Sequence, residues 1–311
     1  MKIVLSNKLN IMFKFLDEPT LLTSQQWSEE TIPLVSISCI TYNHEKYIKD
    51  AIEGFLMQKT TFPVEILIHD DASTDDTAMI VREYELKYPH LIKPIYQTEN
   101  QYSKQEGVIG RLQRGRARGK YYAICEGDDY WIDPFKLQKQ VEFLEDNPEY
   151  SLIWSDVDKL HHTTGIIENN SLSKIPIKNT LNDFLVKAWF VATCTWVYRT
   201  EFFDDNLIKY PFRESYSVGD LRILLIALDH GKITKFPEKN STAVYRVLDE
   251  SASHFRSFKK IFDFQKGVLQ IQLDFAKYFK VTNSIKFLII CQYLIALFKR
   301  LLVEILYRIR N

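Results

Sequence analysis

The sequence is poor in cysteine and has no excess of either charge. Its 311 residues include four cysteines, and no two of them have the Cys-x-x-Cys spacing of a zinc or redox site. We therefore expect buried, reduced thiols at Cys39 and Cys125 and a location in the reducing cytosol. Lysine plus arginine and aspartate plus glutamate both number 40, so the overall charge does not favour nucleic acid as a partner.

Long apolar runs are missing towards both ends of the chain. The first thirty residues contain an apolar stretch that Lys8, Lys14 and Asp17 interrupt, which is unlike a signal peptide. We expect this N-terminal segment to pack beside the main domain. The uncharged run from Phe287 to Phe298 is shorter than the roughly 20 apolar residues that cross a bilayer.

The densest chemical signal is the segment Glu126-Gly-Asp-Asp129, which we call the acid turn. Three carboxylates lie in four residues, directly after the apolar run that begins at Tyr121. Carboxylates this close raise one another's pKa unless a cation or hydrogen-bond donors neutralise them. Oxygen ligands suit Mg²⁺ or Mn²⁺, and Mg²⁺ usually completes its shell with substrate phosphates. The acid turn therefore predicts a divalent-metal site with a nucleoside diphosphate as its partner.

Two upstream segments repeat a pattern of strand, polar turn and helix. The turns are Thr41 to His44 and Asp70 to Ser73, each after an apolar strand and before helical periodicity. We expect Ser73 and Asp76 to cap the second of these helices. The alternation predicts an α/β fold with a mostly parallel, Rossmann-like sheet and helices on both faces. Because ligands bind at the carboxyl ends of such strands, the polar turns and the acid turn can converge.

Five segments, in order along the chain, resemble motifs of the family 2 inverting glycosyltransferases of the GT-A fold, especially bacterial enzymes of surface-polysaccharide synthesis. They are Ser38-Cys-Ile-Thr-Tyr-Asn43, Ile68-His-Asp-Asp-Ala-Ser-Thr-Asp-Asp-Thr77, Gly119-Lys-Tyr-Tyr-Ala-Ile-Cys-Glu-Gly-Asp-Asp-Tyr-Trp131, Gly219-Asp-Leu-Arg222 and Ala243-Val-Tyr-Arg246. The resemblance covers residues 33 to 250. It departs from the family pattern where Ile40 replaces a proline and Leu248 a histidine.

The resemblance implies a donor site and a metal site. Asp70 would accept a hydrogen bond from the imide N–H of uracil or thymine, and Asp128 would face the ribose. Asp129 would bind Mn²⁺ or Mg²⁺, with Glu126 standing where the family more often has the first aspartate of Asp-x-Asp. The remaining donor-binding residues that it implies are Thr41, Tyr42, Asn43 and Asp71.

The resemblance also implies the catalytic group. Asp220 would be the general base that takes the proton of the acceptor hydroxyl as its oxygen attacks the anomeric carbon. Arg246 would add positive charge near the phosphates, and Trp131 and Trp196 would contact sugar or acceptor.

Most of these residues have a purely structural alternative. Asp70 and Asp71 could serve only as turn residues, and Asp220 could cap the apolar helix that follows it. Trp131 could seal the sheet to the next helix, and Trp196 could be buried in a strand. The basic segment from Arg111 to Lys120 could steer a polyanion or form a solvated helix face.

The last 57 residues predict a helical C-terminal extension, because they contain no proline and a single glycine. One face is apolar, and the tail turns basic after Phe298. Residues 285–311 could lie flat on the inner face of the plasma membrane, join two copies as a homodimer, or pack as a hairpin on the catalytic domain. The residues of the apolar face are Phe287, Ile290, Leu294, Phe298, Leu301, Ile305 and Ile309.

Together these features predict an N-terminal extension (1–32), a GT-A domain (33–254) and the helical extension (255–311). The GT-A domain would have a nucleotide-binding half (33–132) and an acceptor half (133–254). The expected function is metal-dependent, inverting transfer from a UDP or dTDP sugar to a glycan or lipid-linked acceptor in the synthesis of a capsule or lipopolysaccharide.

Two alternatives to this function stay open. A sugar-nucleotide nucleotidyltransferase would carry a glycine-rich phosphate loop, and none follows Ile40. A non-catalytic, glycan-binding protein of the same fold is the third possibility, although such a protein would be expected to have lost the acidic residues of the site.

Overall fold

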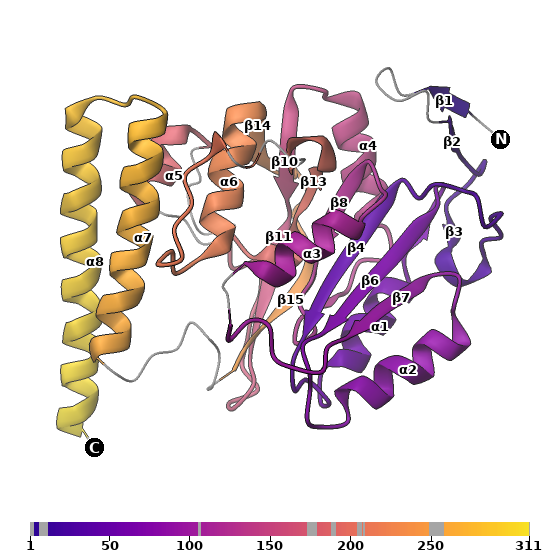
Figure 1. Ribbon diagram of the computed structural model, residues 1–311, viewed down its shortest axis with the longest axis horizontal. Helices are drawn as coiled ribbons and strands as arrows, with labels where there is room; N and C mark the ends of the chain where they lie inside the picture. The colour runs from indigo at the N-terminus through magenta and orange to yellow at the C-terminus, as the bar shows by residue number, and fades with distance from the viewer. Residues whose placement is uncertain are drawn as a thin grey trace. The chain divides into compact units, whose positions relative to one another are not determined.

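The chain forms two compact units in the computed structural model, which describes residues 3–5, 12–104, 107–172, 179–187, 191–203, 207, 209–248 and 258–310 (Figure 1). The first unit comprises Met1–Ile175, Val191–Phe203 and Thr234–Val247, and the second comprises Pro176–Phe190, Asp204–Ile233 and Leu248–Asn311. This division differs from the predicted boundary at residue 255. Two helices ahead of that boundary group with the C-terminal helices because they pack against them.

A mixed sheet forms the core of the first unit. Its parallel part consists of β8, β4, β6 and β7, in that spatial order, and β13 then pairs antiparallel with β8 and with β10. The expected mostly parallel sheet is therefore confirmed for the strands that carry the polar turns. The strands are β4 (Val35–Thr41), β6 (Val64–Asp70), β7 (Ile92–Tyr96), β8 (Tyr121–Ile124), β10 (Tyr150–Trp154), β13 (Val197–Arg199) and the edge strand β14 (Lys232–Lys235).

Strands β4 and β6 are buried along almost their whole length because helices cover both faces of the sheet. In Figure 1, α3 lies in front of the sheet and α1 behind it. The helices of this unit are α1 (Ile48–Leu56), α2 (Thr77–Lys87), α3 (Val108–Arg116) and α4 (Lys136–Asp146). Cys39 and Cys125 are fully buried and unpaired, as expected.

A second sheet brings a late segment of the chain to the acid turn. Its strand order is β12 (Ile167–Glu168), β11 (Asp156–His161), β15 (Ser241–Val247) and β9 (Tyr130–Trp131). The β11–β12 pair is antiparallel. Strand β15 pairs antiparallel with β9, which starts directly after the acid turn, with Val244 opposite Tyr130.

The N-terminal segment packs on the first unit where it is described. Strand β3 (Thr20–Leu21) pairs with β5 (Lys59–Thr60), and Leu22, in the short helix η1 (Leu22–Ser24), is fully buried. Ahead of them, β1 (Ile3–Leu5) and β2 (Met12–Lys14) form a small hairpin. The expectation that this segment packs beside the main domain is confirmed for these residues.

Four helices make the second unit: α5 (Leu181–Lys187), α6 (Gly219–His230), α7 (Phe258–Tyr278) and α8 (Asn283–Arg310). Helices α7 and α8 form an antiparallel hairpin, and α5 contacts all three of the others. Gly267 in α7 lets the loop before α6 approach closely, because a Cβ there would lie 1.8 Å from Ser217 Oγ. The expected C-terminal helices are confirmed within the described residues.

One lysine of the first unit is buried at the start of α4. Lys136 is fully buried, donates to Gln140 Oε1 at 2.7 Å and holds its ammonium group 4.4 Å from the centre of the Trp131 ring. Burial lowers the pKa of Lys136 to about 7. The folded chain therefore releases a proton near neutral pH that the unfolded chain keeps up to about pH 10.

Replacing Lys136 with methionine tests this buried amine. Because the unfolded state binds the extra proton, the free energy of unfolding of the wild type relative to Lys136→Met rises by about 1.4 kcal/mol per pH unit between about pH 7 and pH 10. Denaturant titrations across that range measure the difference. The control is Lys87→Met, which replaces an exposed lysine of α2. If the unfolding free energy of both variants depended on pH in the same way, Lys136 would not be a buried neutral lysine.

Candidate active site

The three predicted turns meet at one edge of the main sheet. Thr41 at the end of β4 lies opposite Asp70 at the end of β6 in the parallel register. The chain beyond β8 continues beside β4, because the Cys125 N–H donates to the Ser38 carbonyl at 3.0 Å and the Gly127 N–H to the Ile40 carbonyl at 2.9 Å. The convergence predicted from the sequence is therefore confirmed.

The acid turn packs closely on side chains from the end of β4 and the loop after it. A Cβ at Gly127 would lie 2.6 Å from Thr41 Oγ1 and 3.0 Å from His44 Nδ1. Both distances are shorter than ordinary carbon contacts, so the position accepts only glycine without movement of the turn. Gly127 thereby sets the spacing between the acid turn and the two neighbouring side chains.

Gly127→Ala tests this close contact. We expect a loss of roughly 1–3 kcal/mol in unfolding free energy, because the methyl group must displace the side chains of Thr41 and His44, together with weaker nucleotide binding. The matched control is Gly115→Ala in α3, where an added Cβ meets nothing within 4 Å. That control gains up to about 1 kcal/mol from helix propensity. Equal stability of the two variants in urea titrations would refute the contact.

Asp129 is the most buried acid of the turn. Its side chain is 2% exposed, and Oδ1 accepts the N–H of Arg246 at 2.8 Å. Burial raises the pKa of Asp129 well above that of an ordinary aspartate, and the neighbouring Asp128 and Glu126 raise it further. The turn therefore concentrates negative charge, which a cation would stabilise.

The other two acids have different partners. Both carboxylate oxygens of Glu126 accept from the Thr193 hydroxyl, at 3.0 and 2.9 Å. Asp128 Oδ2 lies 4.0 Å from His44 Nε2, and burial lowers the pKa of that histidine. Sequence reasoning did not single out either partner: it brought the turn that contains His44 to the acid turn without specifying a contact, and nothing local marked Thr193 in η2 (Thr193–Thr195).

Arg246 clamps the acid turn to α1. Its Nη1 donates to the backbone carbonyl of Asp128 at 2.7 Å, and Nη2 pairs with Asp50. The guanidinium also lies over the rings of Tyr130 and Tyr47, 4.4 and 5.1 Å from their centroids. Arg246 therefore lies at the acid turn, with its charge engaged by Asp50 and two aromatic rings, and its predicted role near the phosphates stays a prediction.

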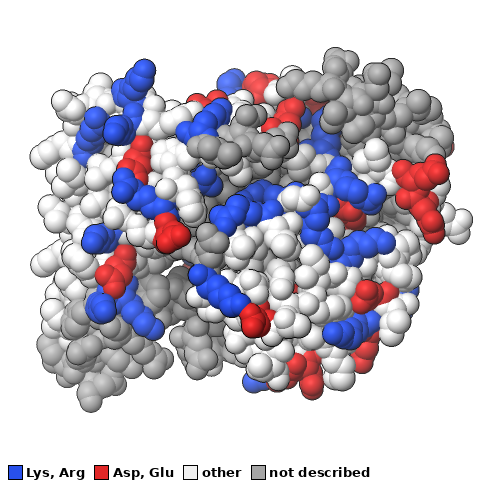
Figure 2. Space-filling model, in the orientation of Figure 1, with Lys and Arg blue, Asp and Glu red and all other residues white. Residues whose placement is uncertain are grey.

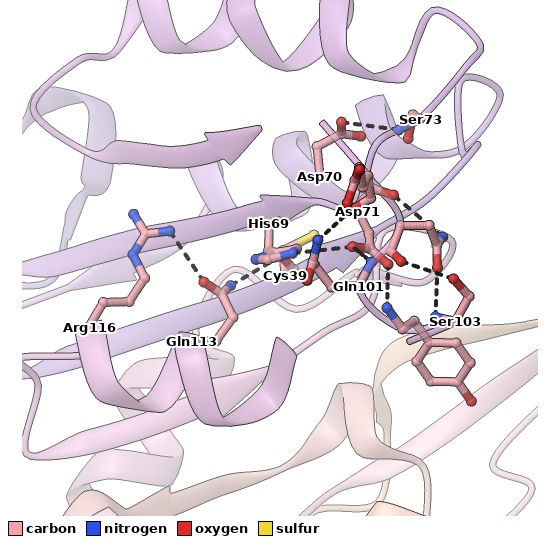
Figure 3. Close-up of polar contacts among 12 residues, drawn as sticks. Cys39, His69, Asp70, Asp71, Ser73, Gln101, Ser103, Gln113 and Arg116 are labelled. Atoms are coloured by element: carbon pink, nitrogen blue, oxygen red, sulfur yellow. Dashed lines mark hydrogen bonds and ion pairs between the residues drawn. The ribbon is translucent and has the colours of Figure 1, made fainter. Parts of the chain in front are cut away.

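The two aspartates after β6 differ in their hydrogen bonding (Figure 3). Asp70 is 2% exposed; one oxygen accepts the Ser73 N–H at 3.3 Å, and the other, Oδ1, is buried without a hydrogen-bond partner in the part of the chain that the structure describes. Asp71 instead accepts the N–H groups of Gln101 and Tyr102, at 2.7 and 3.0 Å. Asp70 therefore retains an acceptor for a ligand, while Asp71 holds the segment after β7.

Asn43 joins the two polar turns. Its backbone has a φ of 55°, its N–H donates to Ser73 Oγ at 2.9 Å, and its side-chain oxygen accepts the Thr74 N–H at 2.8 Å. The predicted Ser73–Asp76 capping box is wrong, because Ser73 is used in this link. Asp75 accepts the N–H of Thr77, the first residue of α2, at 3.0 Å.

Two further residues predicted for the donor site lie at the end of β4. The Thr41 hydroxyl is buried and has no hydrogen-bond partner among the described residues, whereas Tyr42 is 43% exposed. A buried hydroxyl and a buried carboxylate oxygen without partners are costly unless a ligand satisfies them. These two atoms, on Thr41 and Asp70, make the ends of the two adjacent strands a candidate polar binding site.

The structure places both candidate tryptophans in the core instead of on a ligand surface. Trp131 is 1% exposed, donates to the Cys194 carbonyl at 2.7 Å and packs edge-on against Phe55. Trp196 is fully buried. The expected sugar contacts of both residues are therefore corrected, because both indole rings are buried among other residues. Trp131 seals the core as its structural alternative proposed, and Trp196 is buried directly before β13 instead of within a strand.

Asp220 lies in the second unit, as the second residue of α6. Its Oδ1 accepts the N–H of Leu221 at 2.6 Å, and burial raises the pKa of its carboxyl group. The loop before it is anchored to α7: Ser215 Oγ donates to Gln270 at 2.7 Å and the Tyr216 hydroxyl to Asp274 at 2.8 Å. Asp220 therefore starts a well-held helix.

The acid turn suits a divalent cation in the chemistry of its oxygens. Within the described ranges, no three His, Cys, Asp or Glu side chains are arranged to hold a metal by themselves. Mg²⁺ and Mn²⁺ commonly take one or two carboxylates together with substrate phosphates and water. Asp129, with its raised pKa among like charges, and the neighbouring Glu126 fit such a partial ligand set.

Comparison with known proteins assigns the family. The model of "Glycosyl transferase family 2" matches residues 36–207, which is more than half of the chain. The chain belongs to this family. A Mycobacterium tuberculosis protein without a described function is 36% identical over 221 residues, covering 68% of this chain and 58% of its own length. An Escherichia coli relative is 35% identical over 112 residues, covering 36% of this chain and 41% of that protein.

Solved structures confirm the GT-A fold of this family 2 chain. Staphylococcus aureus TarS in complex with UDP-GlcNAc has a TM-score of 0.63 at 22% identity, over 85% of this chain and 72% of that one. A Pyrobaculum calidifontis mannosyltransferase in complex with GDP-Man and Mn²⁺ has a TM-score of 0.55 at 17% identity, over 84% and 69% of the two chains. At these identities the likeness establishes the fold alone.

Proposed function

We propose that the chain transfers a sugar, with inversion, from a UDP or dTDP sugar to a hydroxyl of a glycan or lipid-linked acceptor in bacterial surface-polysaccharide synthesis. The observation that carries the proposal is the strand register that sets Thr41, Asp70 and the acid turn at one sheet edge. Nucleotides bind at such edges. The family match favours this activity over the nucleotidyltransferase and the non-catalytic alternatives.

Relatives support the donor and acceptor classes. The E. coli relative is named a UDP-Glc:alpha-D-GlcNAc-diphosphoundecaprenol beta-1,3-glucosyltransferase, which pairs a UDP sugar with a lipid-linked acceptor. TarS was solved with UDP-GlcNAc. With an acceptor of this kind, the reaction would take place at the inner face of the plasma membrane.

In this proposal Asp70 recognises the base of the donor nucleotide. Its buried Oδ1 has no protein partner and can accept the imide N–H at N3 of uracil or thymine. Cytosine has no hydrogen at N3, so it would leave the carboxylate oxygen unsatisfied. Asp71 acts as a positioning residue, because its oxygens are already bonded to Gln101 and Tyr102.

Asp70→Asn tests base recognition. Hydrogen bonds to charged groups contribute roughly 1.5–3 kcal/mol, so the wild type is expected to bind UDP about tenfold to a hundredfold more tightly than CDP. The asparagine amide can donate to N3 of cytosine, so the variant loses most of this preference. Calorimetry with UDP and CDP in the presence of Mn²⁺ measures it. An unchanged UDP-to-CDP ratio in Asp70→Asn would remove Asp70 from the base site.

The acid turn would hold the diphosphate through a metal. Asp129 would hold Mn²⁺ or Mg²⁺ with Glu126 beside it, Asp128 would face the ribose, and the bound metal would stabilise the negative charge of the departing nucleoside diphosphate. Glu126 keeps its place through Thr193, and Arg246 holds the turn backbone in position. The Mn²⁺ in the P. calidifontis mannosyltransferase complex supports a divalent cation at a site of this fold.

Asp220 would be the general base. Its carboxylate takes the proton of the acceptor hydroxyl while the acceptor oxygen forms its bond to the anomeric carbon and the bond to the diphosphate breaks. Burial raises the pKa of Asp220, which makes the carboxylate a stronger proton acceptor than an exposed aspartate. The Leu221 N–H orients the carboxylate through its contact with Oδ1.

Aspartate-to-asparagine variants test these two roles. We expect Asp129→Asn to abolish Mn²⁺-dependent turnover of UDP sugars and Asp220→Asn to lower kcat at least a hundredfold while leaving the Kd for UDP unchanged. The base acts in its deprotonated form, so the wild-type rate decreases as the pH is lowered through the raised pKa of Asp220. This decrease at acidic pH is absent in Asp220→Asn.

Exposed aspartates on helices of the same units serve as matched controls. Asp146→Asn in α4 and Asp263→Asn in α7 are expected to keep wild-type turnover. Asp129→Asn relieves like-charge repulsion, so its metal-free stability should equal or exceed that of the wild type. Full turnover in Asp220→Asn would eliminate it as the base.

A further inference from the structure

Helix α8 exposes a broad apolar face. Eight large apolar side chains of this one helix are between 42% and 68% exposed, with Phe287 and Phe298 the most exposed at 66% and 68%. In Figure 2 the outer edge of α8, at the left, is mostly white. The exposed residues are Phe287, Leu288, Ile290, Leu294, Ile295, Phe298, Leu302 and Ile305.

The opposite side of α8 faces α7. Ile289 is fully buried, and the Arg300 guanidinium lies 5.4 Å from the ring centroid of Phe264 in α7. With 3.6 residues per turn, these two positions lie on one side of α8, and the exposed apolar residues occupy the other. The apolar face is therefore directed away from the rest of its own hairpin.

The width of this face favours a flat partner over a second helix. Placed on a helical wheel, the exposed apolar residues from Ile290 to Leu288 span roughly 160°. A coiled-coil seam uses only two of every seven positions, so a second copy of α8 would leave much of the face uncovered. The hydrocarbon boundary of a bilayer covers a face of this width.

Charge identifies the kind of surface. Helix α8 contains five basic residues and one acidic residue, Glu304. Lys286 and Lys299 fall at the two borders of the apolar face on the helical wheel, from which long side chains reach lipid phosphates. This arrangement complements anionic headgroups, and a protein surface without negative charge would leave it unmatched.

We propose that the apolar face of α8 docks in the plane of an anionic lipid bilayer. Among the described residues, no helix has the length and apolarity that a membrane crossing requires, so α8 would lie on the surface. The inference goes beyond sugar transfer and stands on α8 alone. In the proposed function, it would keep the chain at the surface where a lipid-linked acceptor is presented.

Vesicle co-sedimentation without any sugar substrate tests the docking. The full chain is expected to sediment with vesicles of phosphatidylglycerol and phosphatidylcholine. Phe287→Gln/Phe298→Gln should lower the partition coefficient at least tenfold, since two exposed phenylalanines no longer enter the bilayer. Phe262→Gln, which changes an exposed phenylalanine of α7, is the matched control and should partition like the wild type.

The two lysines at the borders of the apolar face provide a second, independent test of vesicle binding. Each of Lys286→Gln and Lys299→Gln should weaken binding to the anionic vesicles about fivefold and leave binding to pure phosphatidylcholine unchanged. Circular dichroism and UDP calorimetry show whether each variant folds, and Leu294→Gln/Ile305→Gln replaces the phenylalanine pair if that pair unfolds. Because no sugar transfer is measured, failure here is distinct from failure of the proposed function.

Two results would overturn the proposal. The first is a failure of vesicle docking to depend on the face: the wild-type protein stays in the supernatant with anionic vesicles, or the apolar-face variants sediment as the wild type does. The other is a stable dimer in sedimentation velocity that the phenylalanine variant dissociates, without vesicle binding; the face would then join two copies of the chain.

Discussion

The close contact between the acid turn and the end of β4 determines the geometry of the candidate site. At Gly127 the acid turn packs directly on the side chains of Thr41 and His44, and the Gly127 N–H donates to the Ile40 carbonyl. Protein interiors are packed so densely that even one added methyl group must displace its neighbours. This single contact therefore sets where the acids lie relative to Thr41 and Asp70.

The electrostatics of the first unit follow from that packing. The guanidinium of Arg246 bonds the backbone carbonyl of Asp128 and pairs with Asp50, so it holds the turn through its backbone. Burial together with like charge keeps the pKa of Asp129 raised. The metal ion that we propose would offset this repulsion.

The second unit joins two roles in one helical bundle. The loop that leads into α6, and thus to Asp220, is held by side chains of α7, and α7 is also the helix on which α8 packs. The proposed base and the proposed lipid-docking face are therefore built on the same framework. This differs from the predicted division, in which residues 255–311 formed a separate extension.

Local patterns in the sequence were sufficient for the elements and for the acids at their ends. Apolar runs followed by polar turns predicted β4, β6 and β8, and parallel strands necessarily bring Thr41, Asp70 and the acid turn to one edge. Tertiary structure alone decided the partners. His44, Thr193 and the clamp by Arg246 depend on contacts between segments far apart in the chain. Trp131 and Trp196 are buried and do not line a ligand surface, and the carboxylate oxygens of Asp71 are already hydrogen-bonded. Exposure and hydrogen bonding depend on neighbours that no sequence pattern specifies.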